Sequence, residues 1–262
     1  MTARVLLLGG LDPSGGAGIT ADATVVAMHG LQPLPVPLAL TAQNRHGFRE
    51  CFAVPEGQWL AMLDAAVADG PVHAIKTGLL GSAAGIEALA RRLRALAGAV
   101  PIVVDPVLSA TAGGYAADGE VLGAYREHLL PLATLCVPND PELQALAGGD
   151  PDNLLALGCR AVLHKGGHRQ DAMAIDTLYV GGAQHRYERP RLLVGPVHGT
   201  GCALASAITA RLAAGQELAA ACRQAGDWLA SLLAELARTP GDGLPRPLPF
   251  VASPSLRRTS TR

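Results

Sequence analysis

Short apolar runs alternate with helical patterns along the first two thirds of the chain, and this alternation constrains the fold more than any other feature of the sequence. Six runs are expected to be buried strands: Arg4–Leu8, Val36–Thr41, His73–Thr77, Pro101–Asp105, Leu135–Pro138 and Ala161–His164. Helices are expected between several of them, over Ile19–His29, Glu56–Asp69 and Ile86–Leu96. Strands that alternate with helices pair in parallel through right-handed crossovers, so the sequence predicts a layered α/β domain.

The pattern changes after residue 170. Four further elements are expected: a β-hairpin of Thr177–Val180 and Gln184–Arg189, and two Ala-rich helices over Cys202–Ala214 and Leu218–Ala237. From Arg238 onward the chain has five prolines and no periodicity. We therefore predict a single domain over residues 1–245, followed by an irregular, proline-rich tail over residues 246–262.

Three prolines, Pro33, Pro35 and Pro37, fall in or beside the second expected strand. Each proline removes one backbone donor from the ladder of hydrogen bonds between strands. This strand is therefore expected at an edge of the sheet or with a bulge.

The composition excludes several classes of protein. Hydrophobic residues make up 49% of the 262 residues and charged residues 16%, so most of the chain must fold. Lys plus Arg number 21 and Asp plus Glu 22, and this net charge of −1 argues against a nucleic-acid partner. No apolar run approaches the ~18 residues that cross a bilayer, and the start lacks the apolar core of a signal peptide, so we expect no membrane partner and a cytoplasmic location. The five cysteines form no C-x-x-C pair, which favours neither a disulfide framework nor a zinc cluster.

A glycine-rich stretch, Gly9–Gly18, lies between the first expected strand and the first expected helix and holds five glycines in ten residues. The overlapping segment Gly16–Ala21 matches the G-x-G-x-x-A dinucleotide pattern, but only weakly, because the preceding loop is long and no acidic residue stands about 20 positions further on. No Lys-Ser or Lys-Thr follows, which excludes a Walker loop. So many glycines weaken a fold unless the backbone must approach something closely, so a bound ligand is favoured over a turn without one.

A second glycine-rich stretch, His198–Cys202, runs directly into an Ala-rich helix. Backbone N–H groups at such a helix start converge on an anion, and the helix dipole favours negative charge there. Cys202 falls in the first turn, where the pKa of a thiol is lowered and the thiol is partly ionised near neutral pH. A buried, inert cysteine at a tight turn explains the pattern equally well.

These stretches belong to a series of motifs that resembles one known family. The series is Asp12–Ile19, Ala42–Asn44, Lys76–Gly78, Val104–Val107, Pro138–Glu142, Lys165–His168 and His198–Cys202. It is similar, over about residues 4–245, to hydroxymethylpyrimidine/phosphomethylpyrimidine kinases of the ribokinase superfamily. The resemblance implies a three-layer sandwich with a mainly parallel central sheet and helices on both faces. It also implies a homodimer that uses ATP and Mg²⁺ to phosphorylate a small aminopyrimidine alcohol, and then its monophosphate, in thiamine biosynthesis.

The resemblance assigns one group of residues to the pyrimidine. Gln43 would hold its amino-substituted edge, since a carboxamide pairs with an amino donor beside a ring nitrogen as Gln pairs with adenine. Without the family context, the sequence indicates that Gln43 is an amide in a surface loop. Asp22 would line the same pocket, although a carboxylate near a helix start needs no ligand. Gly10 also belongs to this group, and Leu79 and Val107 would be apolar walls, with Leu79 where the family often has Met.

A second group is assigned to phosphoryl transfer. Asn139 and Glu142 match the family's Asn-x-x-Glu, which orders Mg²⁺ near the ATP phosphates; helix capping by Glu142 is the alternative. Lys165 would contact the phosphates, and weaker ATP-side roles fall to Asp105 and Lys76. The turn of Gly199, Thr200 and Gly201 would stabilise the γ-phosphate in the transition state.

The resemblance assigns Cys202 as the base that takes the hydroxymethyl proton. Two rivals stay open: a pyridoxal or pyridoxine kinase of the same superfamily, and a non-catalytic protein that senses the pyrimidine or ATP.

Overall fold

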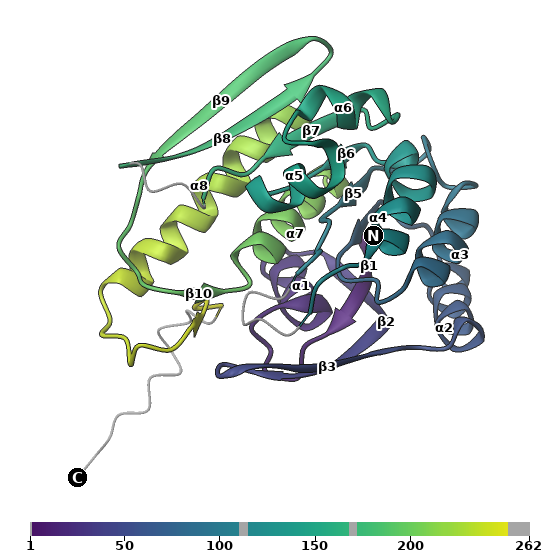
Figure 1. Ribbon diagram of the computed structural model, residues 1–262, viewed down its shortest axis with the longest axis horizontal. Helices are drawn as coiled ribbons and strands as arrows, with labels where there is room; N and C mark the ends of the chain where they lie inside the picture. The colour runs from purple at the N-terminus through teal and green to yellow at the C-terminus, as the bar shows by residue number, and fades with distance from the viewer. Residues whose placement is uncertain (1, 110–114, 168–171, 251–262) are drawn as a thin grey trace.

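The computed structural model describes residues 2–109, 115–167 and 172–250. Its centre is a nine-stranded sheet in the order β3-β2-β1-β4-β5-β6-β7-β8-β9 (Figure 1). The strands are β1 Arg4–Leu11, β2 Gln32–Asn44, β3 Gly47–Ala53, β4 Ala74–Thr77, β5 Ile102–Val104, β6 Leu135–Cys136, β7 Ala161–His164, β8 Met173–Val180 and β9 Ala183–Pro190. In this spatial order, the six neighbouring strands β2, β1, β4, β5, β6 and β7 pair in parallel. Strand β3 at one end, and β8 and β9 at the other, pair antiparallel.

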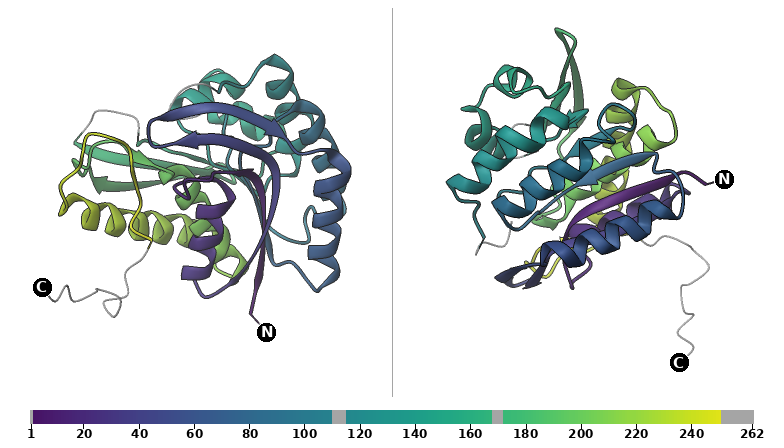
Figure 2. Two further views of the ribbon diagram at one scale, coloured as in Figure 1. Left: turned by 90° about the horizontal axis from the view of Figure 1, so that it is seen from below. Right: turned by 90° about the vertical axis from the view of Figure 1, so that its right-hand side faces the viewer.

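Helices cover both faces of the sheet (Figure 2). They are α1 Gly18–Met28, α2 Glu56–Ala68, α3 Ala83–Leu93, α4 Gly119–Ala124, α5 Asp140–Ala147, α6 Pro151–Ala156, α7 Thr200–Ala213 and α8 Leu218–Ala237, with short π and 3₁₀ turns over Tyr125–Leu129 and Leu130–Leu132. The core on one face is built with α2 to α6, and the core on the other with α1, α7 and α8. Along β1, Leu6 and Leu8 enter the first core, while Val5 and Leu7 enter the second, as the two-residue period of a strand requires. The predicted three-layer α/β architecture is therefore confirmed.

Every strand and helix expected from the sequence is present, but some elements were missed. The hairpin strands β8 and β9 are longer than predicted, and β3 and α4 to α6 were not predicted. His168 of the expected motif lies outside the described residues, as do residues 251–262 of the expected tail.

The proline-containing strand β2 has neighbours on both sides, so the expected edge position holds for only half of it. Strand β3 pairs with Ala39–Asn44 and does not reach the prolines. The N–H of Gln32 donates to the carbonyl of Ala3, next to β1, so the nitrogens of the three prolines point to the side without a partner strand. The expected bulge is present, because Gly9 pairs with Pro37 and Gly10 with Ala39, which leaves Leu38 of β2 without a partner on β1.

The prediction of an irregular tail from residue 246 is wrong for residues 246–250. Arg246–Pro247 forms a short strand, β11, that pairs in parallel with β10, Val197–His198. Leu248 is 3% exposed and packs into the core beside α7 and α8. The Arg246 guanidinium donates to the carbonyl oxygens of Val194, Leu236 and Thr239. The burial of Leu248 and the hydrogen bonds of Arg246 hold this segment in place. Its prolines leave no periodicity in the sequence from which this order could be predicted.

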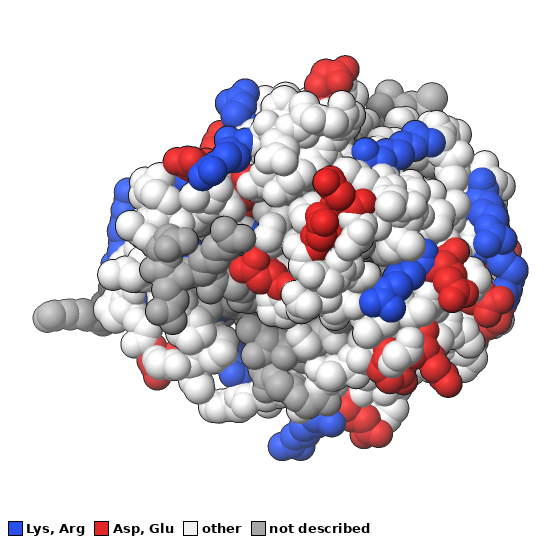
Figure 3. All heavy atoms as spheres, turned by 45° about the horizontal axis from the view of Figure 1, so that its top comes forward, with Lys and Arg blue, Asp and Glu red and all other residues white. Residues whose placement is uncertain are grey.

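Within the described residues, every helix is too short or too polar to cross a bilayer. Figure 3 shows acidic and basic side chains interspersed on one face of the molecule, with no continuous patch of either sign. This distribution agrees with the near-zero net charge of the chain.

Candidate active site

A cavity of about 660 Å³ lies at the carboxyl ends of the parallel strands, where α/β sheets place their functional groups. All of the residues assigned to the site from sequence line it: Gly10, Asp22, Gln43, Lys76, Leu79, Asp105, Val107, Asn139, Glu142, Lys165, Gly199, Thr200, Gly201 and Cys202. They come from β1, β2, α1, the ends of β4 to β7, the first turn of α5 and the start of α7. The structure thus brings the whole predicted set together, and the role of each residue stays a prediction.

The two glycine-rich stretches meet backbone to backbone beside this cavity. Gly199 has a φ of +79°, and a Cβ there would collide with the carbonyl oxygen of Gly16. A Cβ on Gly16 would in turn lie 2.6 Å from Cδ2 of His198. Glycine is therefore required at both positions, for the left-handed conformation and for the close approach.

Asp12 and His198 hold the two glycine-rich loops together, and neither was predicted as a site residue. The buried Asp12 carboxylate accepts hydrogen bonds from the Ser14 backbone at 2.8 Å, the Ser14 hydroxyl at 2.8 Å and the Ala17 backbone at 3.0 Å. His198 Nε2 lies 2.9 Å from Asp12 Oδ2. Although burial opposes ionisation, these bonds hold the pKa of Asp12 below 3.8. An Asp followed by Pro, Ser and Gly is typical of a side-chain-capped turn, and was the available sequence signal.

A buried ion pair forms one wall of the cavity. Lys76 Nζ lies 2.7 Å from Asp22 Oδ2, and the Ser206 hydroxyl donates to Asp22 Oδ1 at 2.8 Å. Burial raises the pKa of Asp22, whereas burial of Lys76 is outweighed by the carboxylates around it, so the pKa of Lys76 is also raised. Both oxygens of Asp22 are engaged within the protein, so Asp22 positions Lys76 as well as lining the pocket.

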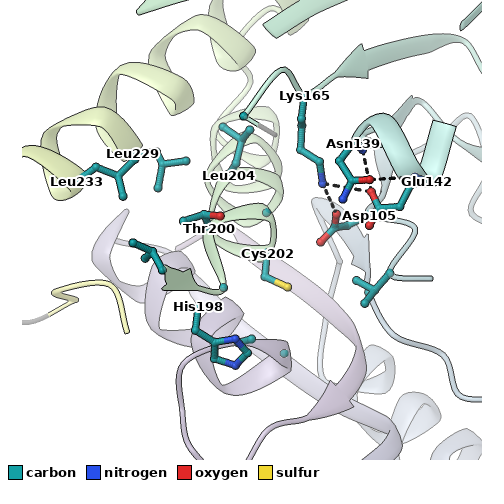
Figure 4. Close-up of a pocket in the computed structure, with 18 of the residues that line it drawn as sticks. Asp105, Asn139, Glu142, Lys165, His198, Thr200, Cys202, Leu204, Leu229 and Leu233 are labelled. Atoms are coloured by element: carbon teal, nitrogen blue, oxygen red, sulfur yellow. Dashed lines mark hydrogen bonds and ion pairs between the residues drawn. The ribbon is translucent and has the colours of Figure 1, made fainter. Parts of the chain in front are cut away.

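A second cluster joins three of the predicted phosphate-side residues (Figure 4). Lys165 Nζ lies 3.1 Å from Asp105 Oδ1 and 3.6 Å from Glu142 Oε2. Burial opposes the ionisation of Asp105, but Lys165 and Lys76 together lower its pKa. Asp105 Oδ2 is buried without a hydrogen-bond partner among the described residues, and Lys76 Nζ stands 3.8 Å away from it. The cluster therefore presents an ionised carboxylate to the cavity.

Asn139 and Glu142 cap the start of α5, as the alternative interpretation of Glu142 held. The Asn139 side chain accepts from the Glu142 N–H at 2.9 Å, and Glu142 Oε2 accepts from the Asn139 N–H at 2.8 Å. Burial raises the pKa of Glu142. The same carboxylate lines the cavity beside Lys165, so capping fixes its direction without removing it from the site.

Of the two interpretations of Cys202, the lowered pKa is wrong, and the buried cysteine fits the structure. Cys202 is half-buried at the start of α7, and its sulfur points into the cavity (Figure 4). Burial, assisted by the carboxylates of Asp105 and Asp22, raises the pKa of the thiol to about 12 and outweighs the opposing effect of Lys76. Cys202 is therefore a neutral thiol near neutral pH.

Apolar side chains line the two ends of the cavity. One end is walled by Leu204 of α7 and by Leu229 and Leu233 of α8 (Figure 4). The residues at this end were not predicted, because their helical spacing is that of ordinary core residues. The other end holds Gln43 with the predicted walls Leu79 and Val107, and adds two aromatic residues, Phe48 and Tyr115, that sequence analysis also missed.

Comparison with known proteins identifies the family. A family model described as phosphomethylpyrimidine kinase matches residues 12–244. The chain is 39% identical over 249 residues to a thiamine biosynthesis bifunctional protein of Geobacter sulfurreducens; the match covers 91% of this chain and 50% of that protein, so the chain spans half of its length. It is 34% identical over 243 residues to the hydroxymethylpyrimidine/phosphomethylpyrimidine kinase of Escherichia coli, covering 88% of this chain and 91% of that enzyme.

A solved structure of a kinase shares the fold. The ADP complex of Bacillus subtilis pyridoxal kinase aligns with a TM-score of 0.80 and 28% identity, over 88% of this chain and 92% of that one. The family model spans the first glycine-rich stretch from Asp12 onward, the whole of the second, and every charged residue of the cavity. The chain belongs to the phosphomethylpyrimidine kinase family of phosphotransferases.

Proposed function

We propose that the cavity binds ATP and 4-amino-5-hydroxymethyl-2-methylpyrimidine side by side and transfers the γ-phosphoryl group to the hydroxymethyl oxygen, in thiamine biosynthesis. A second transfer, to the resulting monophosphate, gives the diphosphate. One observation carries the proposal: a helix start suited to phosphate and a carboxamide suited to an aminopyrimidine line the same cavity, in a member of this family.

The phosphates are placed at the start of α7. The backbone of Gly199 to Gly201 begins a helix of 14 residues, whose dipole and unpaired N–H groups attract an anion. Lys165 Nζ lies over this turn, 3.2 Å from where a Cβ on Gly201 would be. A cation at this point neutralises charge on a transferring phosphoryl group, and phosphoryl transfer depends mostly on such positioning and neutralisation.

The nucleotide base is placed at the apolar end of the cavity. Leu229 and Leu233 of α8 and the loop residue Val194 line that end. Arg246 donates to the Val194 carbonyl at 2.7 Å, so the ordered C-terminal segment holds this wall in place. An adenine ring that covers these side chains would extend its phosphates toward the start of α7.

The donor set beside Lys165 fits Mg²⁺. Asp105 Oδ2 is buried without a hydrogen-bond partner among the described residues, and the Glu142 carboxylate lies on the same cluster. Mg²⁺ prefers oxygen ligands and is usually held by one or two carboxylates together with substrate phosphates. Asp105 and Glu142 would hold the ion, with Asn139 nearby, and the ion would supply charge neutralisation at the phosphates.

Gln43 reads the amino-substituted edge of the pyrimidine in this proposal. Gly10 brings the β1 backbone close to the ring, and it packs directly on Leu79, since a Cβ there would lie 3.0 Å from that side chain. Leu79 and Val107 cover the apolar surface of the ring. The hydroxymethyl group then extends toward Cys202 and the helix start.

The Cys202 thiol orients the hydroxymethyl oxygen in this mechanism rather than acting as a preformed thiolate base. Its raised pKa leaves it protonated, and the triphosphate of ATP adds negative charge, which raises the pKa further. A loose phosphoryl-transfer transition state requires little base assistance before the bond to phosphorus forms. The hydroxyl proton therefore leaves late, when the new bond has made that oxygen acidic, and passes to a phosphate oxygen or to water, while ADP is the leaving group.

The deciding experiment is incubation with Mg-ATP and hydroxymethylpyrimidine, followed by identification of mono- and diphosphate by mass. A parallel reaction with pyridoxal tests the second candidate, which the structural similarity to a pyridoxal kinase supports. Higher kcat/KM on pyridoxal would make that activity the primary one. Binding of pyrimidine and ATP without release of ADP would make the chain a binding protein instead. The homodimer and the cytoplasmic location stay predictions.

A further inference from the structure

Aromatic rings are rare in this chain, and two of them meet at the cavity. Phe, Tyr and Trp together make up 3% of the residues. Phe48 and Tyr115 nevertheless both line the cavity, with ring centroids 5.9 Å apart and planes inclined by 42°. In a chain that packs its core almost entirely with aliphatic side chains, an aromatic pair at a ligand cavity calls for an explanation beyond core filling.

A bulge in β3 brings Phe48 to the cavity. The ladder between β2 and β3 pairs Ala42 with Glu50 and then Gln43 with Phe48, so Arg49 has no partner. In a regular ladder Arg49 would stand opposite Gln43, on the same face of the ribbon. The bulge puts a buried ring there instead and leaves Arg49 exposed. Gln43 and Phe48 are consequently direct cross-strand neighbours, and both line the cavity.

Tyr115 reaches the same place from a different part of the chain. It follows β5, and its backbone is held next to an antiparallel bridge between Ser109 and Ala116. The N–H of Ala117 also donates to the carbonyl of Leu108 at 2.8 Å. Two segments that are distant in sequence thus each carry one ring to the end of the cavity that holds Gln43.

We infer that Phe48 and Tyr115 form an aromatic wall that binds the flat face of the substrate ring, while Gln43 reads its amino-substituted edge, so that the pair selects planar heteroaromatic alcohols over saturated ones. The inference rests on the proposed function and names two further residues of the same site. Aromatic rings prefer offset-stacked or edge-to-face contact with another ring, which a saturated sugar cannot supply in the same way. The neutral wall also matches an uncharged pyrimidine better than the cation of Arg49 would.

The test compares steady-state kinetics of Phe48→Leu, Tyr115→Leu and Tyr115→Phe with the wild type. Each leucine variant is expected to raise the KM for hydroxymethylpyrimidine about three- to ten-fold and to leave the KM for ATP unchanged, because the rings lie away from the α8 end of the cavity. Tyr115→Phe keeps the ring and is expected to raise the KM for hydroxymethylpyrimidine less than Tyr115→Leu does. Phe52→Leu is the matched control, since Phe52 lies on the same strand, is 48% exposed and is absent from the cavity lining.

The outcomes separate this inference from the proposed function. No phosphorylated product from the wild type would overturn the proposed function, and with it the substrate named here. If the wild type turns over, two results would overturn the aromatic wall alone. One is an unchanged KM for hydroxymethylpyrimidine in both leucine variants. The other is a rise in the KM for ATP as large as the rise in the KM for hydroxymethylpyrimidine. If Phe48→Leu fails to fold, Tyr115→Leu decides the question, because Tyr115 is only half-buried.

Discussion

His198 Nε2 lies 2.9 Å from Asp12 Oδ2, and this contact joins the two glycine-rich loops across a separation of 186 positions in the chain. His198 stands directly before the helix start to which we assign the phosphates, and Asp12 organises the turn after β1. The pair therefore fixes the two halves of the site relative to each other.

Removing this contact should weaken both folding and turnover. His198→Ala leaves a buried carboxylate without one of its partners, so the free energy of unfolding should fall by about 1–3 kcal/mol. The kcat should fall roughly ten-fold, because small misplacements of a phosphate-binding turn are costly. Urea denaturation and initial rates measure the two effects. His185→Ala, at an exposed position of β9, is the control, and equal behaviour of the two variants would contradict a positioning role for His198.

The same pair makes a prediction about pH. Because the pKa of Asp12 in the folded chain lies below its ordinary 3.8, the carboxylate contributes stability above that pH and loses the contribution as the pH falls through the folded value. The difference in free energy of unfolding between the wild type and Asp12→Asn should therefore shrink between neutral pH and pH values below 3.8. Denaturation at a series of pH values measures it, and a constant difference would show that the charge of Asp12 does not contribute.

The buried pair of Lys76 and Asp22 should be sensitive to loss of one partner. Lys76→Met leaves the carboxylate of Asp22 buried without its cation, and the free energy of unfolding should fall by about 3–5 kcal/mol. Adding Asp22→Asn should restore part of the loss, since the uncompensated charge is then absent. Denaturant titrations give the values. The control is Arg92→Ala, which breaks an exposed pair with Asp64 and should cost less than about 1 kcal/mol. A loss from Lys76→Met as small as the control's would refute the prediction.

Glu142→Gln separates the charge of this residue from its capping role. Glutamine can still accept the hydrogen bond from the Asn139 N–H, so the melting temperature should stay close to that of the wild type. Loss of the charge should raise the Mg²⁺ concentration for half-maximal rate about ten-fold or more. A magnesium titration of initial rates measures the effect. If Glu142→Gln and the wild type need the same magnesium concentration, Glu142 is a cap alone.

Cys202 should behave as a neutral thiol that orients the substrate. Because its pKa is raised from 9.0 to about 12, alkylation by iodoacetamide should be slow at neutral pH and should accelerate steadily into the alkaline range. Peptide mass spectrometry at a series of pH values follows the reaction at this residue. A burst of modification at neutral pH would instead show a preformed thiolate.

Substitution of Cys202 distinguishes the two roles through turnover. Cys202→Ala should lower kcat about ten-fold and leave ATP binding intact. Cys202→Ser should retain more activity than the alanine variant, because a hydroxyl can still hold the substrate oxygen by a hydrogen bond. A thiolate base would make both variants equally poor. Wild-type turnover in both variants would remove Cys202 from the mechanism.

The layered fold follows from local patterns and was predictable, whereas the site residues were assigned through the family resemblance. Strands such as Arg4–Leu11 are continuous apolar runs, as strands buried on both faces must be. Their carboxyl ends then share one edge of the sheet, which gathers Lys76, Asp105 and Lys165 without any further information. Strand β3 escaped detection because only one of its faces is buried and its bulge breaks the alternation at Arg49.

What could not be predicted depends on contacts between distant segments. Nothing near His198 in the sequence indicates that Asp12 is its partner, and the order of residues 246–250 depends on bonds that Arg246 makes to three other segments. The direction of the Cys202 pKa shift could not be decided from the sequence for the same reason. The helix start that would lower the pKa is local, while the burial and the two carboxylates that raise it come from tertiary structure.

The backbone contact between Gly16 and Gly199 also bears on synthesis and engineering. The turn to which we assign the phosphates rests against the carbonyl of Gly16, beside β1, whereas the turn itself begins α7, far along the sequence. A fragment that ends before α7 lacks the turn, and one that starts after β1 lacks the surface against which it rests. Division of the chain between these two points should therefore yield halves that are inactive alone and recover activity only on reassociation.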